Sequence, residues 1–355
     1  MNTNENHCFR LPAEWEPQSG IILIWPHEDT DWRPYLNEIT EVYLQMADAI
    51  TRFEPLLIMA RDTEKVHSLL AERLTEGQMK RVTLFACDNN DTWARDVAPI
   101  SLVSDKGPKG SLQALCLLDF CFNGWGEKFA AEKDNRINRQ LYEAGLLQGV
   151  LENHKDFVLE GGSIESDGDR TLFTTTGCLM APHRNQPLTQ EEIDKQLRLF
   201  FPNVERVVWL DYGQLAGDDT DGHIDTIVRV APNHTLLYIG CDDKEDEHYE
   251  DFRLLEEQLK QLRTIDGDPY RLLRLPMPDA IYDDGERLPA THANFLIING
   301  AVLVPTYNQP EKDKAALDII QEAFPDREII GIDSRTIIRQ HGSIHCLTMQ
   351  LPLNR

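Results

Sequence analysis

Short apolar segments of strand length alternate with longer amphipathic segments along most of this chain. Runs rich in aliphatic residues predict strands over 20–25, 56–59, 204–210 and 328–332. Apolar residues at helical spacing, several times after an opening Asp, Thr or Pro, predict helices over 35–53, 63–75, 127–147, 189–200, 246–263 and 311–323. This alternation of predicted strands and helices is typical of an α/β protein.

Four pairs of short segments predict β-hairpins. The clearest pair is 294–298 and 301–304, because Asn299-Gly300 between them is the strongest short hairpin signal. The other three pairs are 97–103 with 112–118, 163–166 with 170–173, and 224–230 with 235–239. Because a helical segment and a further strand follow most of these hairpins, each unit of the chain reads as ββαβ.

Polar residues recur at a near-constant spacing beside these predicted strands. Asp96, Glu160, His223, His292 and Cys346 are separated by 64, 63, 69 and 54 residues. Such self-similarity indicates a repeat architecture, and carboxylates, imidazoles and a thiol are an unusual set to repeat for packing alone. We therefore predict a single domain over residues 1–355, a five-fold pseudosymmetric α/β propeller of ββαβ units around a central cavity. A two-domain α/β sandwich is the alternative with the same order of elements.

Charge and cysteine content narrow the class of protein. The formal net charge of −25 argues against a nucleic-acid partner and would attract a cationic small molecule, although solubility alone would also explain it. No apolar run is long enough for a membrane span, and residues 1–6 lack the regions of a signal peptide. Seven cysteines without a C-x-x-C pair favour a reducing cytoplasm over a disulfide framework. A homo-oligomer is compatible with this composition.

Cys346 is the cysteine best placed in the sequence to act as a nucleophile. It follows the glycine- and histidine-containing segment 341–345, just before a terminal strand. A free thiol is only about a few per cent thiolate at pH 7, so it needs a cationic neighbour in order to react. The remaining cysteines are interpreted as small buried hydrophobic residues: Cys8, Cys87, Cys116, Cys121, Cys178 and Cys241.

Carboxylates and an imidazole accompany this thiol. His223 and Asp225 are two residues apart, so on a strand their side chains would point to the same face. Asp96 follows Arg95, with which a surface ion pair is the simpler interpretation, and Glu160 stands before two glycines. A planar guanidinium is best held by opposed carboxylates, because an unpaired buried cation is costly. Asp96 and Asp225 could hold such a cation, which would in turn favour the thiolate form of the cysteine.

Five motifs, taken together and in order, resemble the agmatine deiminase family. They are WARD at 93–96, FNGWG at 122–126, EGGSI at 160–164, GHID at 222–225 and IHC at 344–346. This family is also described as the Porphyromonas-type peptidyl-arginine deiminases, within the guanidino-group-modifying superfamily. The resemblance extends from about residue 17 to residue 352. It implies a propeller of five ββαβ units, the pentein fold, and a hydrolase that needs neither cofactor nor metal.

The resemblance also implies roles for individual residues. Cys346 matches the nucleophile of the family, and His223 matches its general acid and base. Asp96 and Asp225 match the carboxylates that hold the guanidinium, and Glu160 matches the acidic residue near the histidine. The reaction implied is the hydrolysis of agmatine to N-carbamoylputrescine and ammonia, through a covalent thiouronium on the cysteine and on a route to putrescine.

The distal amine of agmatine needs binding residues of its own, for which Trp93 and Asp219 are the best candidates by position. Segments 291–294, 341–343 and 349–350 depart from the family motifs, and these departures bear on the substrate more than on the reaction. Peptidyl-arginine or free arginine, giving citrulline, is therefore the main alternative substrate. His292 has a second interpretation as a packed histidine.

Three other functions stay open on the sequence alone. An amidinotransferase would pass the same covalent intermediate to an amine instead of water. A propeller without catalysis would bind the ligand and release no product. A metal-dependent hydrolase would use residues of zinc-binding type whose spacing fits no standard zinc pattern, namely His223, Asp225, His341, His345 and Cys346.

Overall fold

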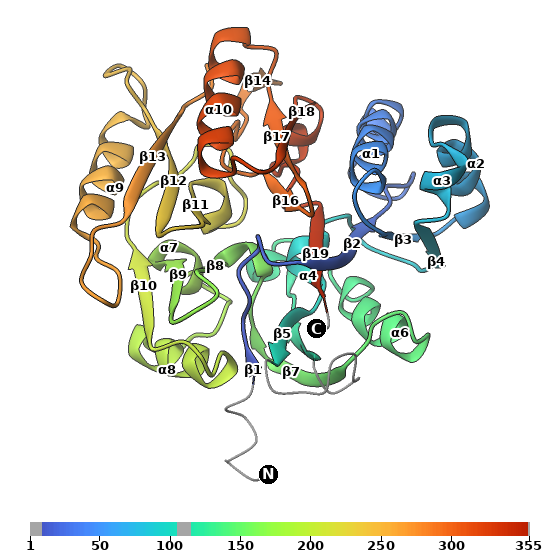
Figure 1. Ribbon diagram of the computed structural model, residues 1–355, viewed down its shortest axis with the longest axis horizontal. Helices are drawn as coiled ribbons and strands as arrows, with labels where there is room; N and C mark the ends of the chain where they lie inside the picture. Colours follow the sequence, from blue (N-terminus) through green and yellow to red (C-terminus); the bar gives the residue numbers. More distant parts are fainter. Residues whose placement is uncertain (1–8, 105–114, 354–355) are drawn as a thin grey trace.

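The computed structural model describes residues 9–104 and 115–353, and these residues form a mixed α/β fold (Figure 1). The described strands make five sheets of three or four strands and a two-stranded ribbon, β14 (Tyr282–Asp283) with β15 (Glu286–Arg287). In Figure 1 these five sheets follow one another around the middle of the molecule, and the longer helices lie toward the outside. Segment 1–6 and Cys8, for which the sequence made predictions, lie outside the described residues.

Each of the five larger sheets contains the same connection: an antiparallel pair of strands, then a helix, then a strand parallel to the second of the pair. The first unit consists of β5 (Ile100–Ser104), β6 (Leu115–Cys121), α6 (Ile137–Glu143) and β7 (Val150–Val158), and the second of β8 (Ile164–Ser166), β9 (Thr171–Thr175), α8 (Gln190–Phe200) and β10 (Arg206–Leu210). The third unit consists of β11 (Val228–Ala231), β12 (Thr235–Gly240), α9 (Tyr249–Gln261) and β13 (Arg271–Pro276), and the fourth of β16 (Leu296–Ile298), β17 (Ala301–Thr306), α10 (Pro310–Ala323) and β18 (Glu328–Asp333). The fifth unit consists of β19 (Thr348–Pro352), β2 (Gln18–Ile24), α1 (Leu36–Thr51) and β3 (Leu56–Ala60). The last unit joins the two ends of the chain, because β19 pairs with β2.

Two sheets carry an extra strand. The short β1 (Phe9–Arg10) pairs with the edge of β5, and β4 (Val82–Ala86) pairs in parallel with β3. Between β3 and β4 the chain forms α2 (Thr63–Arg73) and α3 (Glu76–Met79). Residues 9–104 therefore contribute to two neighbouring sheets.

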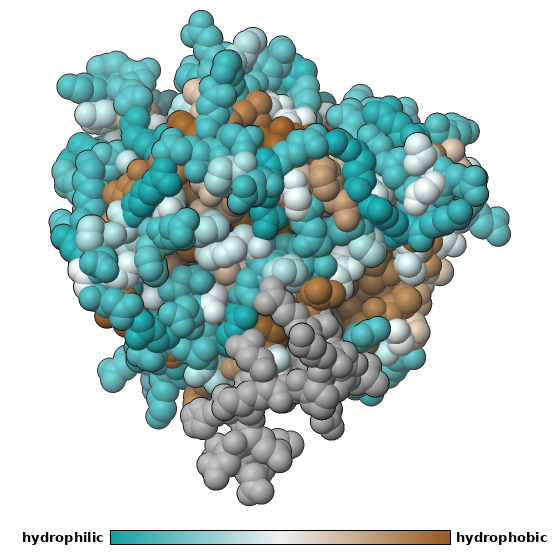
Figure 2. Space-filling view, viewed as in Figure 1, coloured by the Kyte–Doolittle hydropathy of each residue, from teal (hydrophilic) through white to brown (hydrophobic). Residues whose placement is uncertain are grey.

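Burial explains why these segments take up strands and helices. Residues Ile21 to Ile24 of β2 are fully buried, as expected for a strand covered on both faces. Helix α8 instead buries only Ile193 and Leu197, one face of an amphipathic helix, and begins at Thr189 with a capping box. Hydrophilic residues cover most of the face seen in Figure 2, in keeping with the acidic composition. None of the described helices combines the length and the apolar character that crossing a membrane requires.

Most predicted elements occur, and one predicted helix is wrong. Five of the six predicted helices begin and end within three residues of their expected bounds. The exception is 127–147, where α6 covers only Ile137–Glu143, after a 3-10 turn over Asp134–Arg136. Before this 3-10 turn, the chain changes direction at α5 (Gly124–Glu127), in which Gly124, Trp125 and Gly126 have positive φ. A regular helix cannot include such left-handed residues.

Two predicted strands begin later than expected. Segment 224–230 starts as the 3-10 helix η6 (Ile224–Thr226), and β11 begins only at Val228. Segment 97–103 starts at the end of the short helix α4 (Ala94–Val97), and β5 begins at Ile100. The partner strand of β5 was predicted from residue 112, and its residues 112–114 lie outside the described part of the chain.

These late starts reveal where the repeated polar residues lie. Each antiparallel pair is preceded by an irregular turn, such as α4, η6 and the 3-10 helix η5 (Gly161–Ser163). α4 packs on η5, and η5 packs on η6. Turns from separate sheets therefore meet, and side chains in them can converge although they are about sixty residues apart in the sequence.

Candidate active site

Four of the predicted site residues meet around Gly162 and Asn294. Asp96 lies in α4, His223 is the N-cap of η6, Asp225 lies within η6, and Cys346 lies two residues before β19. A Cβ on Gly162 would lie 2.6 Å from His223 Nδ1. It would also lie 3.0 Å from Asp225 Oδ2 and 3.0 Å from Asp96 Oδ1. Glycine is therefore required here, because any side chain would fill the space between the three functional groups.

A pocket of about 600 Å³ leads to this group. Asp96 and Cys346, which are 5% and 4% exposed, form its buried end. Two indole side chains, Trp93 and Trp125, contribute aromatic walls and pack edge to face. The more exposed lining includes Asp31, Asp91, Asp219, Gln340 and His341. The side walls of the pocket are therefore aromatic, and both of its ends are acidic.

The Cys346 thiol lies between an amide and a carboxylate. Its Sγ is 3.3 Å from Asn294 Oδ1 and 3.7 Å from Asp225 Oδ2. Asn294 Oδ1 also accepts a hydrogen bond from the Cys346 backbone N–H at 3.2 Å, which fixes the side chain relative to the chain. Burial raises the pKa of Cys346 well above its usual value, and the negative charges of Asp225 and Asp96 raise it further. Without a bound cation, the thiol keeps its proton at neutral pH.

We therefore expect alkylation of Cys346 by the neutral reagent iodoacetamide to be slow at pH 7 and to accelerate through pH 9. The sign follows from the raised pKa: below that pKa, the thiolate fraction falls about tenfold for each pH unit. A haloacetamidine of similar reactivity carries a positive charge. We expect it to react with Cys346 faster than iodoacetamide does at pH 7, because its charge, held between Asp96 and Asp225, stabilises the thiolate. Mass spectrometry of the Cys346 peptide measures both rates, with Cys346→Ala as the blank. Fast iodoacetamide alkylation with the same rate from pH 6 to pH 9 would indicate a preformed thiolate instead.

Asp96 and Asp225 are both buried but are held differently. Asp96 accepts hydrogen bonds from the Gly162 N–H at 3.0 Å and from Trp125 Nε1 at 2.9 Å. Burial raises the pKa of Asp96, as do Asp225 and Glu160, while His223 lowers it. Burial also opposes ionisation of Asp225, but the hydrogen bond to His345 and the charge of that histidine outweigh the effect of burial and lower the pKa of Asp225. Asp225 Oδ1 is fully buried and has no hydrogen-bond partner among the described residues, so it can accept one from a ligand.

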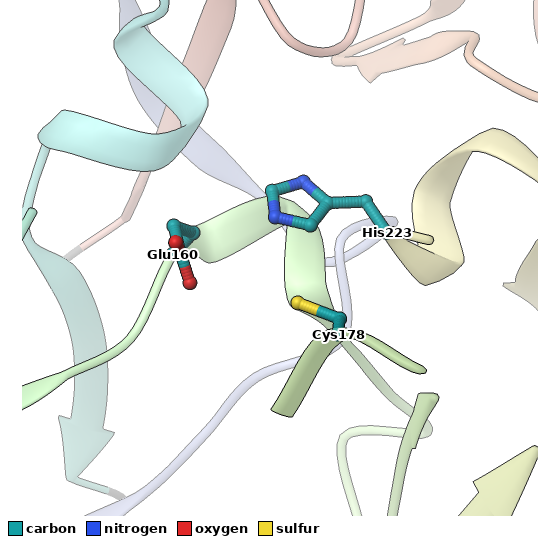
Figure 3. A group of neighbouring side chains, drawn as sticks. All are labelled: Glu160, Cys178 and His223. Carbon is teal, nitrogen blue, oxygen red and sulfur yellow. The ribbon is translucent and has the colours of Figure 1, made fainter. Parts of the chain in front are cut away.

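His223 lies beside Asp96, with Nδ1 3.7 Å from Asp96 Oδ1. Figure 3 shows its ring directed toward Glu160, with the sulfur of Cys178 close below the ring. Burial lowers the pKa of His223, but Asp96, Cys178 and Glu160 together raise it well above its usual value. The imidazole therefore holds a proton at neutral pH and can act first as an acid.

Glu160 is held in place by an arginine that the sequence interpretation did not include. Arg184 Nε donates to Glu160 Oε1 at 2.8 Å, and both side chains are fully buried. The same guanidinium contacts Asp221 Oδ2 at 2.7 Å and the Thr220 carbonyl at 2.9 Å. Arg184 thus joins the turn before β8 to the acidic turn before η6. No motif near residue 184 indicated this, because its partners are distant in the sequence.

His345 connects the site to a buried charge network, which the sequence did not reveal. Its Nδ1 is 2.7 Å from Asp225 Oδ2, and its Nε2 is 2.8 Å from Glu14 Oε1. Glu14 is also bound by Arg95 at 3.0 Å and by Arg229 at 2.6 Å. Burial opposes ionisation of Glu14, but these cationic partners lower its pKa well below the usual value. His345 therefore fixes Asp225 through Oδ2, the same oxygen that lies 3.7 Å from the thiol.

Two expectations about individual residues are wrong. Arg95 does not form a surface ion pair with Asp96, because it is buried and binds Glu14. His292 does not enter the pocket: its Nε2 contacts Asp313 at 3.1 Å and its Nδ1 contacts the Pro276 carbonyl at 3.0 Å. The interpretation of His292 as a packed histidine therefore agrees with the structure.

The position expected of His292 is taken by Asn294, two residues later in the same turn. Its Oδ1 contacts the nucleophile candidate, and its Nδ2 donates to the Asp225 carbonyl at 3.3 Å. The spacing of the repeat indicated the correct turn, and only the residue within it differs. An asparagine between a histidine and a predicted strand carries no catalytic signal of its own.

Trp93 and Asp219, predicted to contact the distal part of a ligand, both line the pocket. Trp93 Nε1 donates to Asp91 Oδ2 at 3.0 Å, and its ring lies against Gly342. Asp219 lies at the open end, with Oδ2 3.8 Å from His341 Nε2. His341 also contacts the Gly217 carbonyl at 2.7 Å. Because His341 faces the mouth and His345 faces Glu14, the five residues considered for a metal-dependent hydrolase do not converge on one point.

Comparison with known proteins identifies the relatives of this chain. The sequence profile of the Porphyromonas-type peptidyl-arginine deiminases matches residues 10–352. The agmatine deiminase of Pseudomonas aeruginosa strain LESB58 is 32% identical, over 98% of this chain and 96% of its own length. A crystal structure from Porphyromonas gingivalis, proposed to be an arginine deiminase, is 47% identical with a TM-score of 0.90, over 98% of this chain and 99% of that one. A cysteine-to-serine variant of C. jejuni agmatine deiminase with substrate bound is 35% identical with a TM-score of 0.88, over 98% and 97%. The chain thus belongs to the Porphyromonas-type peptidyl-arginine deiminase family.

Proposed function

We propose that this protein is an agmatine deiminase, which converts agmatine and water into N-carbamoylputrescine and ammonia. The observation that carries the proposal is the charge of the pocket. Its buried end presents Asp96 beside Cys346, and its outer lining presents Asp31, Asp91 and Asp219 without any described Lys or Arg. Agmatine is a cation at both ends, so an aromatic channel that is acidic at both ends suits its two charges and its apolar chain.

The guanidinium of agmatine would bind between Asp96 and Asp225. A planar guanidinium donates in-plane hydrogen bonds, and the free Oδ1 of Asp225 is suited to accept one. The two carboxylates would hold the central carbon of the guanidinium against the Cys346 sulfur, which lies 3.7 Å from Asp225 Oδ2. The cation compensates the negative charge that keeps the thiol protonated, so binding itself lowers the cost of forming the thiolate. The thiol proton leaves to solvent at this stage.

The first chemical step would form a carbon–sulfur bond. The Cys346 thiolate attacks the guanidinium carbon and gives a tetrahedral adduct. His223, which holds a proton in the free protein because its pKa is raised, donates it to one terminal nitrogen. The carbon–nitrogen bond breaks, ammonia leaves, and a thiouronium stays on the sulfur. General acid help of this kind contributes on the order of 10²–10⁴-fold to the rate.

The second step would release the product. His223, now neutral, accepts a proton from a water molecule as its oxygen attacks the thiouronium carbon. The carbon–sulfur bond then breaks, the new hydroxyl becomes the carbonyl of the ureido group, and its proton returns to the sulfur. Glu160 would orient His223 in both steps, because Arg184 fixes the carboxylate beside the ring. The cycle needs only water, so no cofactor is required.

The wider context of the reaction is also a proposal. The shared connection of the five sheets supports a five-fold pseudosymmetric propeller of the pentein type, with residues 1–355 as a single catalytic domain. The cysteine content favours the cytoplasm. N-carbamoylputrescine is putrescine with a carbamoyl group on one amine, so a later hydrolysis of that group would give putrescine.

Free arginine is the second candidate substrate, because the Porphyromonas gingivalis relative at 47% identity is proposed to be an arginine deiminase. Arginine differs from agmatine by an α-carboxylate at the end that would face the mouth of the pocket. There it would meet Asp31, Asp91 and Asp219, with only His341 as a basic residue among the described lining. Like charges in such a site are repelled, so we favour agmatine.

The test is a substrate comparison. We expect kcat/KM for agmatine to exceed that for arginine, and for a peptide with a C-terminal arginine, by at least about 100-fold, which corresponds to ~2.7 kcal/mol of discrimination. A colorimetric assay for ureido products measures all three, and added ornithine or glycine tests for amidino transfer. The variant Asp219→Asn should narrow the agmatine preference, whereas Asp279→Asn, outside the pocket lining, should not. Equal or faster turnover of arginine would contradict the assignment.

A further inference from the structure

A second cluster of chemically reactive side chains lies next to the catalytic group, with one member that the proposed mechanism does not use. Ligand atoms of Glu160, Cys178 and His223 all lie within 4.8 Å of one another. Figure 3 shows the three side chains converging from separate segments of the chain. Cys178 comes from the short helix α7 (Thr176–Leu179), directly after β9. The cluster thus brings together a carboxylate, a thiol and an imidazole.

The cluster has unused bonding capacity. All three residues are 0% exposed. Within the described part of the chain, neither ring nitrogen of His223 nor Oε2 of Glu160 makes a hydrogen bond. Buried polar atoms without partners are uncommon and cost free energy, so each points to a missing ligand. Glu160 Oε1 is bound by Arg184, which leaves Oε2 directed to a different partner.

The geometry points to an inhibitory site for zinc, or for a similar soft divalent cation, formed by Glu160, Cys178 and His223. Oxygen, nitrogen and sulfur are the donor types that zinc binds, and three protein ligands leave a fourth position for water. Zinc-to-ligand bonds of about 2.0–2.3 Å place tetrahedral donors about 3.3–3.8 Å apart, so donor atoms now within 4.8 Å need to approach one another by up to about 1 Å. Binding would release the protons of Cys178 and His223 to solvent. It would not be a cofactor site, because it removes the proton donor.

The inference rests on the proposed function in one respect, the role of His223 in proton transfer. With zinc on one ring nitrogen, His223 cannot become the imidazolium cation, so it can neither protonate the departing nitrogen nor take up a proton from water. Two features set the strength and the rate of binding. The positive charge of Arg184, bonded to Glu160, weakens the site relative to a structural zinc site. The complete burial of the three ligands requires local opening, so inhibition should develop over time rather than at once.

A metal bound by Cys178 and a metal bound by Cys346 would occupy different sites. The Cys346 sulfur lies against Asn294 and Asp225, on the substrate side of the centre. The Cys178 sulfur lies on the side of His223 that faces Glu160. Variants of the two cysteines therefore distinguish a metal bound by Glu160, Cys178 and His223 from a metal bound by the nucleophile Cys346.

The test uses cobalt(II) as a spectroscopic substitute for zinc, added to the full-length protein without substrate. We expect a near-ultraviolet sulfur-to-cobalt charge-transfer band that saturates at one ion per chain and disappears on addition of zinc. The band should persist in Cys346→Ala and in Cys241→Ser, whose cysteine is not a member of the cluster. The band should be lost in Cys178→Ser, because Cys178 supplies the only sulfur of the cluster, and Cys178→Ala is the second variant if folding is impaired. The zinc concentration that halves turnover should rise at least about tenfold in the same variant, relative to its own metal-free activity.

Two results would overturn the inference. A band that is lost in Cys346→Ala and retained in Cys178→Ser would place the metal on the nucleophile. The absence of a band in every folded protein would mean that the cluster binds no metal. If the band behaves as expected but agmatine is not turned over, the metal site stands and the proposed function fails, so the two claims are tested separately.

Discussion

Replacement of Cys346 by alanine is expected to reduce kcat for agmatine by at least about 10⁴-fold while leaving agmatine bound. Loss of a covalent nucleophile removes the intermediate entirely, and such losses reach on the order of 10⁶-fold in other enzymes. Binding should survive because the guanidinium contacts come from Asp96 and Asp225, not from the sulfur. Ammonia release measures turnover, and calorimetric titration of the variant measures binding.

Cys178→Ala provides the matched control for this substitution, because both cysteines are buried and Cys178 lies beside His223. Residual turnover should be far greater in Cys178→Ala than in Cys346→Ala, because only Cys346 forms the covalent intermediate. Turnover of Cys346→Ala within tenfold of the unaltered protein would remove Cys346 from the reaction. Loss of agmatine binding together with turnover would instead place the sulfur among the binding groups.

Asp225→Asn, made in the Cys346→Ala protein so that no turnover occurs, is expected to weaken agmatine binding by about 10²–10⁴-fold. Removal of one member of a buried charge pair typically costs ~3–5 kcal/mol, because the other charge is left buried without compensation. The asparagine keeps the size of the side chain and removes its charge. Calorimetric titration with agmatine gives the change in Kd directly.

Two further variants separate lost charge from lost structure. Asp225 also holds His345, so Asp225→Asn could disturb the network around Glu14, whereas Asp96→Asn leaves that contact intact. We expect both variants to weaken binding. Asp313→Asn is the control for an altered buried carboxylate, because Asp313 contacts His292 outside the pocket lining. Unchanged affinity in both Asp96→Asn and Asp225→Asn would mean that other groups hold the guanidinium.

The repeated units could be predicted from the sequence because each is encoded locally. Hairpin signals such as Asn299-Gly300, apolar strands and amphipathic helices need only a few neighbouring residues, and five of six helices were placed correctly. The turns before each hairpin were harder. The segment after His223 reads as an alternating strand, but Thr226 Oγ1 bonds the His223 carbonyl at 2.8 Å and closes a 3-10 turn. Local side-chain hydrogen bonds of this kind compete with sheet formation.

The residues that support the site could not be predicted, because their contacts span the chain. Glu14 contacts Arg95, Arg229 and His345 across 81, 215 and 331 residues. No periodicity or motif relates positions so far apart. Asp225 illustrates the difference. Its own motif identified it, whereas His345, which fixes it, was considered only as a neighbour of the nucleophile and as a ligand in the metal-dependent alternative.

Detection of the covalent intermediate on Cys346 is the most direct test of the central claim. Protein mixed with excess agmatine and quenched in acid during steady-state turnover should contain one peptide heavier by the mass of agmatine less ammonia, and that peptide should include Cys346. The adduct should be absent from Cys346→Ala and should disappear once agmatine is consumed. An actively turning-over protein that carries no adduct on Cys346, or carries it on a different residue, would contradict the mechanism.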